Sequence, residues 1–113
     1  MPHIVIEHSA GLDRTHDLQA LCDTLWEAFA QHRSVNGPDT VRVRCIAATA
    51  SRIGVEPQSF AHATLLLLPG RDEAVRAELA QMIMDALTAG LPDVGSLTVR
   101  LTDLNPPYLK RML

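Results

Sequence analysis

Aromatic residues are scarce in this chain of 113 residues, which contains two Phe, one Trp and one Tyr. Its core must therefore be built from aliphatic residues, and hydrophobic residues make up 47% of the chain. No apolar run approaches the roughly 20 residues that a membrane span needs. Charged and polar residues begin at Glu7, which argues against a signal peptide. We therefore expect a cytoplasmic protein with no membrane partner.

Cysteine is also rare, and basic runs are missing. The two cysteines, Cys22 and Cys45, are in no metal-ligand or redox spacing, so we expect reduced thiols in the core. The five histidines form neither an HxxH nor an HExxH pattern, so we predict no metal site. The formal net charge is -3, which argues against nucleic acid as the partner.

What the chain does contain is the same pattern twice: a strand, a helix and a second strand. In the first half, residues 3–8 and 40–49 read as strands and residues 15–32 as a helix. Alternation along the second strand places Arg42 and Arg44 on one face. The apolar positions of the helix recur at helical spacing, at Leu18, Leu21, Cys22, Leu25 and Phe29.

The second half repeats this order without a detectable linker. Residues 60–68 and 96–103 read as strands, and residues 72–89 read as a helix that Gly90 stops. The apolar positions of this helix are Val75, Leu79, Met82, Ile83, Ala86 and Leu87. We therefore predict one domain over residues 1–113.

Two such units predict an α/β (α+β) fold, a four-stranded sheet with both helices on one face. The third strand is nearly all apolar from Ala61 to Leu68, so both of its faces are expected to be apolar. Two helices cover only one face of a sheet, and soluble monomers avoid a large exposed apolar patch. We therefore predict a homo-oligomer that packs through its sheets.

Pro2 is the residue with the most distinctive chemistry. After removal of Met1 it carries a secondary amine held in a ring, which cannot rotate about its own φ. An α-amine titrates near pH ~7.7–8.0, so a modest lowering of its pKa leaves a neutral base that can move a proton to or from carbon. Proline at the second position is common, and the alternative is that Pro2 has no chemical role.

Four segments, in order, resemble one known family. They are Met1-Pro2-His3 with three apolar residues after it, Val41-Arg42-Val43-Arg44, His62-Ala63-Thr64-Leu65 through Pro69-Gly70-Arg71, and Asp103-Leu104-Asn105-Pro106 followed by Leu109-Lys110. Together they are similar to the 5-carboxymethyl-2-hydroxymuconate isomerases of the tautomerase superfamily. Residues 50–59 do not align clearly with that family.

The resemblance implies a homotrimer of tautomerase-like subunits, with three sheets forming a central barrel and the helices outside. It implies an isomerase that needs no cofactor and uses the amino-terminal proline, here Pro2, as the catalytic base. The substrate implied is a small unsaturated 2-hydroxy di- or tricarboxylate, converted from enol to conjugated ketone in homoprotocatechuate degradation.

Three arginines are candidates for binding the substrate carboxylates, because guanidinium offers paired donors and keeps its charge. Arg42 and Arg44 have the alternative of a solvated strand face, and Arg44 also that of a subunit contact. Arg71 follows Gly70 at a helix start, where a cation is unfavourable for the helix dipole, which favours a ligand-facing role.

Four further residues have weaker signals. His3 and His62 are expected to be hydrogen-bonded histidines on strands, with orientation of the substrate or tuning of Pro2 as the alternative. Trp26 is expected to pack on the first helix, and Tyr108 to lie in a tail that crosses a neighbouring subunit.

Two other functions fit the same element order. One is a non-catalytic, ferredoxin-like module that binds a regulatory ligand and pairs through its sheet. The other is a tautomerase relative that acts on a different substrate or has lost its activity.

Overall fold

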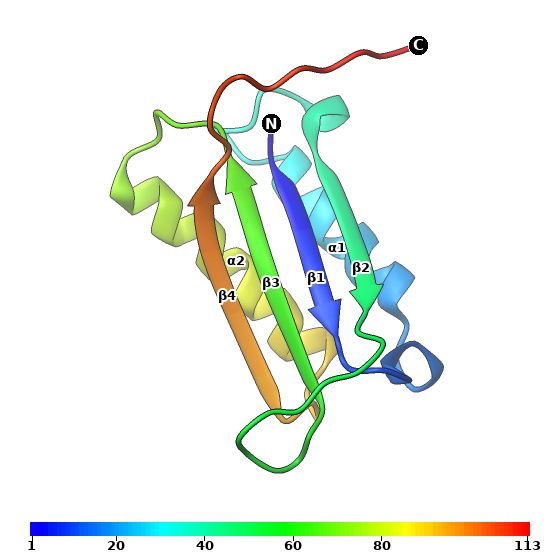
Figure 1. Cartoon of the computed structure of the whole chain (residues 1–113). Coiled ribbons are helices and arrows are strands. Elements are labelled where there is room, and N and C mark those ends of the chain that lie inside the picture. The colour runs from blue at the N-terminus through cyan, green and yellow to red at the C-terminus, as the bar shows by residue number, and fades with distance from the viewer.

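The computed structural model describes residues 1–113 and contains all six predicted elements. The order is β-α-β followed by β-α-β, which confirms the α+β class (Figure 1). The bounds are β1 His3–His8, α1 Leu18–Ala30, β2 Arg42–Ala47, β3 Phe60–Leu67, α2 Glu73–Gly90 and β4 Ser96–Asp103. Two short 3-10 turns, Leu12–Arg14 and Pro38–Thr40, precede α1 and β2. Neither helix has the length and hydropathy that crossing a membrane requires.

The four strands form one sheet in the order β2-β1-β3-β4. β1 runs parallel to β2, β3 runs parallel to β4, and the central pair β1 and β3 is antiparallel. Both helices cover the same face of this sheet, as predicted (Figure 1). In each β-α-β unit the two strands are direct neighbours. This strand order excludes a ferredoxin-like fold, in which another strand lies between the two strands of the β-α-β unit.

Side-chain caps decide where the two helices begin. The Asp17 carboxylate accepts a hydrogen bond from the Ala20 amide at 2.9 Å, and α1 starts one residue after Asp17. The predicted start at residue 15 was three residues early, because the chain first forms the Leu12–Arg14 turn. The Asp72 carboxylate caps α2 in the same way through the Val75 amide at 2.9 Å.

The core lies between the helices and the covered sheet face. Ile4 and Ile6 of β1 point into it and have no exposed surface. Full burial of an aliphatic side chain of this size stabilises the fold by ~1.5–3 kcal/mol. The helical part of the core is one stripe on each helix, as the spacing predicted: Leu21, Leu25 and Phe29 on α1 and Leu79, Ile83 and Leu87 on α2.

The open face of β3 is less apolar than predicted. Burial alternates along the strand, so the helices cover only every second residue. The residues on the open face are Phe60, His62, Thr64 and Leu66. Two of these four are polar, and the expectation of a strand that is apolar on both faces was wrong. The leucine run Leu65–Leu68 simply alternates between the two faces.

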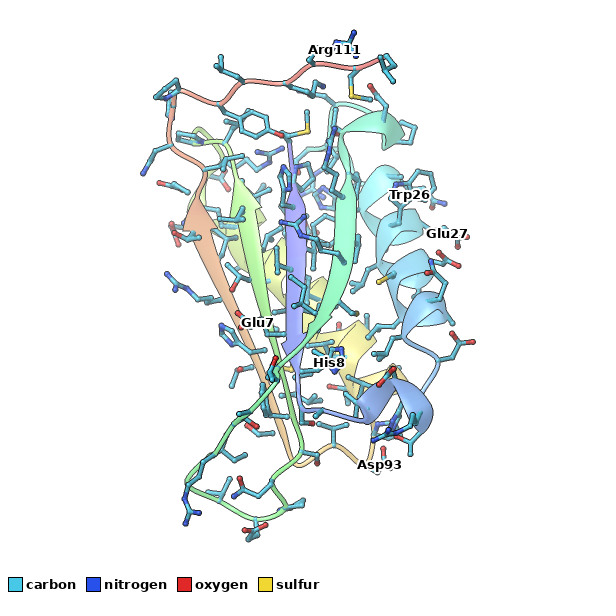
Figure 2. All side chains as sticks on the ribbon, turned by 45° about the vertical axis from the view of Figure 1, so that its right-hand side comes forward. Glu7, His8, Trp26, Glu27, Asp93 and Arg111 are labelled. Carbon is cyan, nitrogen blue, oxygen red and sulfur yellow. The ribbon has the colours of Figure 1, made fainter.

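Trp26 also differs from its prediction. Its residue is 40% exposed, and Figure 2 shows it on the outer side of α1 together with Glu27. The buried stripe of α1 includes Leu25, and the next residue along a helix lies about 100° away from that stripe. Trp26 is therefore a surface residue rather than a packing residue.

The two cysteines lie side by side although they are distant in sequence. Cys22 of α1 and Cys45 of β2 are free thiols, with their Sγ atoms 3.7 Å apart. Both residues are half-buried rather than fully in the core. Burial, followed by the neighbouring Cys22, raises the pKa of the Cys45 thiol to about 12.

We expect Cys45 to react very slowly with iodoacetamide in the folded protein. A rise in pKa of about three units lowers the thiolate fraction at pH 8 by roughly 1,000-fold, and the thiolate is the reactive form. Mass spectrometry of the peptide that contains Cys45 measures the alkylation rate, with urea-unfolded protein as the control. Equal rates in folded and unfolded protein would show that Cys45 is not protected.

Candidate active site

The topology gathers the candidate residues at one end of the sheet. β1 and β2 begin at this end, in the register His3 with Arg42, whereas the antiparallel β3 and the parallel β4 finish there. The turn after β3 brings Arg71 to the same end. The segment after β4 then crosses above the start of β1, and Arg111 marks this crossing in Figure 2.

Pro2 lies at the beginning of β1 and is fully buried. Its carbonyl accepts a hydrogen bond from the Arg42 amide at 3.0 Å, which ties it to β2. The α-amine beside it, that of Met1, has a pKa below its ordinary value of 8.0. Burial is the main cause, and the positive charges of Arg71, Lys110 and Arg42 lower this pKa further, in that order.

The Arg42 guanidinium has only weak or neutral partners. It donates to the Met1 Sδ at 3.0 Å, to the Thr40 carbonyl at 3.2 Å and to the Met112 Sδ at 3.5 Å. A thioether sulfur is a weak acceptor. Removal of Met1 therefore takes away one acceptor of the Arg42 Nη1, which keeps its bond to the Thr40 carbonyl, and leaves Pro2 with a free amine.

Arg44 and His3 lie on the same open face as Arg42. The Arg44 Nη1 contacts the His3 Nδ1 at 3.3 Å, and the His3 Nε2 contacts the Tyr108 hydroxyl at 2.9 Å. Burial, then the charges of Arg44 and Arg42, lower the pKa of His3. His3 is therefore a hydrogen-bonded neutral histidine within the candidate site.

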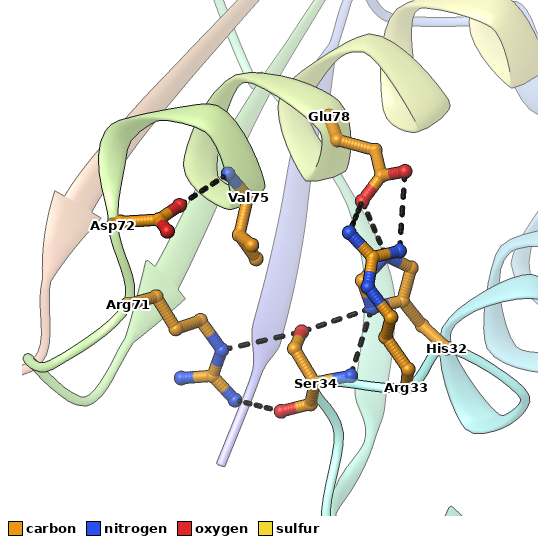
Figure 3. A network of polar contacts seen from close by, with 7 residues as sticks. All are labelled: His32, Arg33, Ser34, Arg71, Asp72, Val75 and Glu78. Carbon is orange, nitrogen blue, oxygen red and sulfur yellow. Dashed lines mark hydrogen bonds and ion pairs between the residues drawn. The ribbon is translucent and has the colours of Figure 1, made fainter.

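Arg71 anchors the chain around the site (Figure 3). Its guanidinium donates to the Ser34 carbonyl at 2.7 Å, to the Leu68 carbonyl at 3.4 Å and to the Ser34 hydroxyl at 3.4 Å. These bonds join the segment after α1 to the turn after β3. His32 and Glu78 continue the network beyond Ser34. All partners of Arg71 are neutral, so its charge stays uncompensated.

The candidate cations at this end of the sheet form no ion pairs. The ion-pair contacts of the structure are made by four other residues: His16, His32, Arg33 and Arg76. Arg42, Arg44, Arg71 and Lys110 take part in none of them. Uncompensated cations with free donors are a suitable environment for a ligand that carries several carboxylates.

The surface pockets of the single chain lie away from these cations. Three occur, of about 190 to 430 Å³, and none is lined by Pro2 or by the three arginines. Met1 and the segment after β4 cover the amino-terminal end instead. No three His, Cys, Asp or Glu side chains come together as a metal site would require.

The structure thus brings together Pro2, Arg42, Arg71 and Arg44, but not His62. His62 lies further along the sheet, where its Nδ1 contacts the Thr98 hydroxyl at 2.6 Å. Sequence reasoning overlooked Lys110 as a contributor to the site. It expected Tyr108 in a tail that crosses a neighbouring subunit, which stays a prediction, and it did not foresee that Tyr108 contacts His3 of its own chain. The Pro106-Pro107 pair, which turns the tail after β4, was the available signal.

Solved structures with the same architecture define the class of protein. A 5-carboxymethyl-2-hydroxymuconate delta-isomerase superposes with a TM-score of 0.81 at 26% identity, over 99% of this chain and 88% of that chain. A 5-carboxymethyl-2-hydroxymuconate isomerase from Deinococcus radiodurans R1 gives a TM-score of 0.81 at 20% identity, over 97% and 88%. A fused 4-OT symmetric trimer gives 0.71 at 22% identity, over 90% and 85%. The fold is that of the tautomerases, and the protein is an isomerase-like enzyme.

The family follows from the sequence itself. Residues 2–100 match the profile of 5-carboxymethyl-2-hydroxymuconate isomerase. The chain therefore belongs to the 5-carboxymethyl-2-hydroxymuconate isomerase family. A comparison with curated proteins finds no match.

Proposed function

We propose that this protein is a keto-enol tautomerase that uses Pro2 as its base after removal of Met1. The substrate is an unsaturated 2-hydroxy di- or tricarboxylate such as 5-carboxymethyl-2-hydroxymuconate. One observation carries the proposal: the amino terminus lies half-covered among cations that have no acidic partner, and its amine has a lowered pKa. A lowered pKa raises the neutral fraction of the amine, and the neutral form is the one that can act as a base.

The reaction is a proton transfer with no net loss or gain of atoms. The neutral amine of Pro2 takes the proton of the 2-hydroxyl group, and the oxygen electron pair forms the C2 carbonyl. The conjugated double bonds shift, and a carbon further along the chain accepts the proton from the prolinium, which regenerates the base. Negative charge develops on the substrate during this transfer, and nearby fixed cations stabilise it.

The arginines supply binding and orientation. Arg42 sits beside Pro2 through its backbone and has only weak side-chain partners, so it is the first carboxylate ligand. Arg44 lies two residues along the same open face and binds a second carboxylate. Arg71 keeps its anchoring bonds and contributes its charge to the site. Fixing the substrate at several carboxylates holds the reacting atoms close to the amine.

The active form is proposed to be a cytoplasmic homotrimer of single-domain subunits, with the three sheets forming a central barrel. The sheet face opposite the helices is open in the single chain, and Ile46 on this face is 48% exposed. Packing between sheets removes such side chains from water. A similar solved structure is described as a symmetric trimer. Analytical ultracentrifugation tests the assembly, and a monomer or dimer would contradict it.

The pH dependence of the enol-to-ketone conversion tests the proposed base. Only the neutral amine is active, so kcat/KM is expected to rise with pH and to reach a plateau. The midpoint is expected below 8.0, because burial and the neighbouring cations favour the neutral form. Ultraviolet absorbance follows the conversion, with 5-carboxymethyl-2-hydroxymuconate as the first substrate. A midpoint at or above 8.0 would show that the environment does not tune the amine.

A further inference from the structure

Tyr108 contacts the candidate site from outside the part of the chain that the family profile matches. The match ends at residue 100, and Tyr108 lies in the segment after β4. Its hydroxyl is 2.9 Å from the His3 Nε2, and its ring meets the His3 ring edge-on, with centroids 5.8 Å apart and planes at 83°. His3 follows Pro2 directly in the chain.

The direction of these hydrogen bonds follows from chemistry. Arg44 has only donors, so the His3 Nδ1 that it contacts must be the acceptor. In a neutral imidazole the other nitrogen then carries the hydrogen, and the lowered pKa of His3 favours the neutral ring. The His3 Nε2 therefore donates to the Tyr108 oxygen. The phenolic hydrogen of Tyr108 has no acceptor within the protein and is free for a ligand.

We infer that the Tyr108 hydroxyl donates a hydrogen bond to the substrate oxygen at C2, with Arg44 and His3 as the positioning residues that set its direction. This inference rests on the proposed function, in which that oxygen gains electron density as Pro2 removes its proton. A donor fixed in advance toward such an oxygen stabilises the transition state.

The first test compares Tyr108→Phe with the unmodified enzyme. The phenyl ring keeps the edge contact with His3 and loses only the hydroxyl. We expect kcat to fall about 10- to 100-fold, at or below the roughly 100- to 1,000-fold that an oxyanion donor contributes, and KM for the enol substrate to change less than kcat. His3→Phe is expected to show a similar loss of kcat, because it removes the positioning bond. His62→Phe is the matched control from the same sheet face and is expected to be unchanged. Unchanged kcat in Tyr108→Phe would overturn the inference.

The second test does not depend on catalysis. Nitrogen NMR of the labelled histidines is expected to show His3 neutral with the hydrogen on Nε2, and hydrogen on Nδ1 would overturn the inferred direction. Calorimetry with 2-oxoglutarate as the probe is expected to show about tenfold weaker binding in Tyr108→Phe. If the unmodified protein does not convert the substrate but Tyr108→Phe still binds 2-oxoglutarate more weakly, the proposed reaction is wrong and the role of Tyr108 in binding the oxygen stands. Equal affinities, or no binding at all, would overturn the role of Tyr108.

Discussion

Replacing Pro2 by alanine is expected to lower kcat/KM for the enol-to-ketone conversion by about two to four orders of magnitude, the usual contribution of a general base. Alanine leaves a primary amine that rotates freely, whereas the proline ring fixes the direction of the nitrogen lone pair. The fold should persist, because the contact of Pro2 with β2 is made by its backbone carbonyl, which alanine retains. Ultraviolet absorbance gives the rate, and circular dichroism with sedimentation gives the fold and assembly.

A blocked amine provides the matched control for this variant. One extra residue placed before Pro2 converts its nitrogen into an amide, which has no basic lone pair. We expect complete loss of conversion in this extended protein with the fold intact. Full activity in either Pro2→Ala or the extended protein would rule out Pro2 as the base.

Replacing Arg42 by glutamine is expected to cause the second-largest loss, about 10- to 150-fold in kcat/KM. A hydrogen bond to a charged group contributes ~1.5–3 kcal/mol, and Arg42 is the arginine closest to Pro2 in the backbone register. We expect most of this loss to appear as a higher KM. The amine should also titrate at higher pH, because the positive charge of Arg42 is one of the causes that lower its pKa.

Arg100→Gln is the matched control for the arginine variant. Arg100 is exposed on β4, whose register with Thr64 places it on the same open face as Arg42. We expect it to leave both KM and the pH profile unchanged. Equal effects of Arg42→Gln and Arg100→Gln would indicate a general influence of net charge, not a carboxylate site. Arg71 is less suitable for this test, because its loss would also release the Ser34 and Leu68 carbonyls.

Local pattern was sufficient to predict the elements of this fold. The strands at residues 3–8 and 96–103 have the predicted bounds, because apolar alternation and turn residues are local properties. The order of the strands could not be predicted, since it depends on which elements pack together after the chain has folded. The open face of β3 was misjudged for a related reason: a leucine run does not show which of its residues the helices cover.

The candidate site was also predictable only in part. Arg42 and Arg44 were predicted to share a face, and pairing of β1 with β2 then places Arg42 opposite His3. Tyr108 lies 105 residues from His3, and no periodicity in the sequence predicts contacts over that separation. Lys110 belongs to the same tail, so its influence on the amine was also beyond prediction.

The most direct test of the account is a titration of the Pro2 nitrogen itself. Intact mass first establishes that Met1 has been removed, and NMR of protein labelled with nitrogen-15 proline then follows the amine across pH. We expect a pKa below 8.0 that coincides with the midpoint of the kcat/KM profile. A Pro2 amine that titrates at or above 8.0, or at a pH different from that of activity, would contradict its role as the catalytic base.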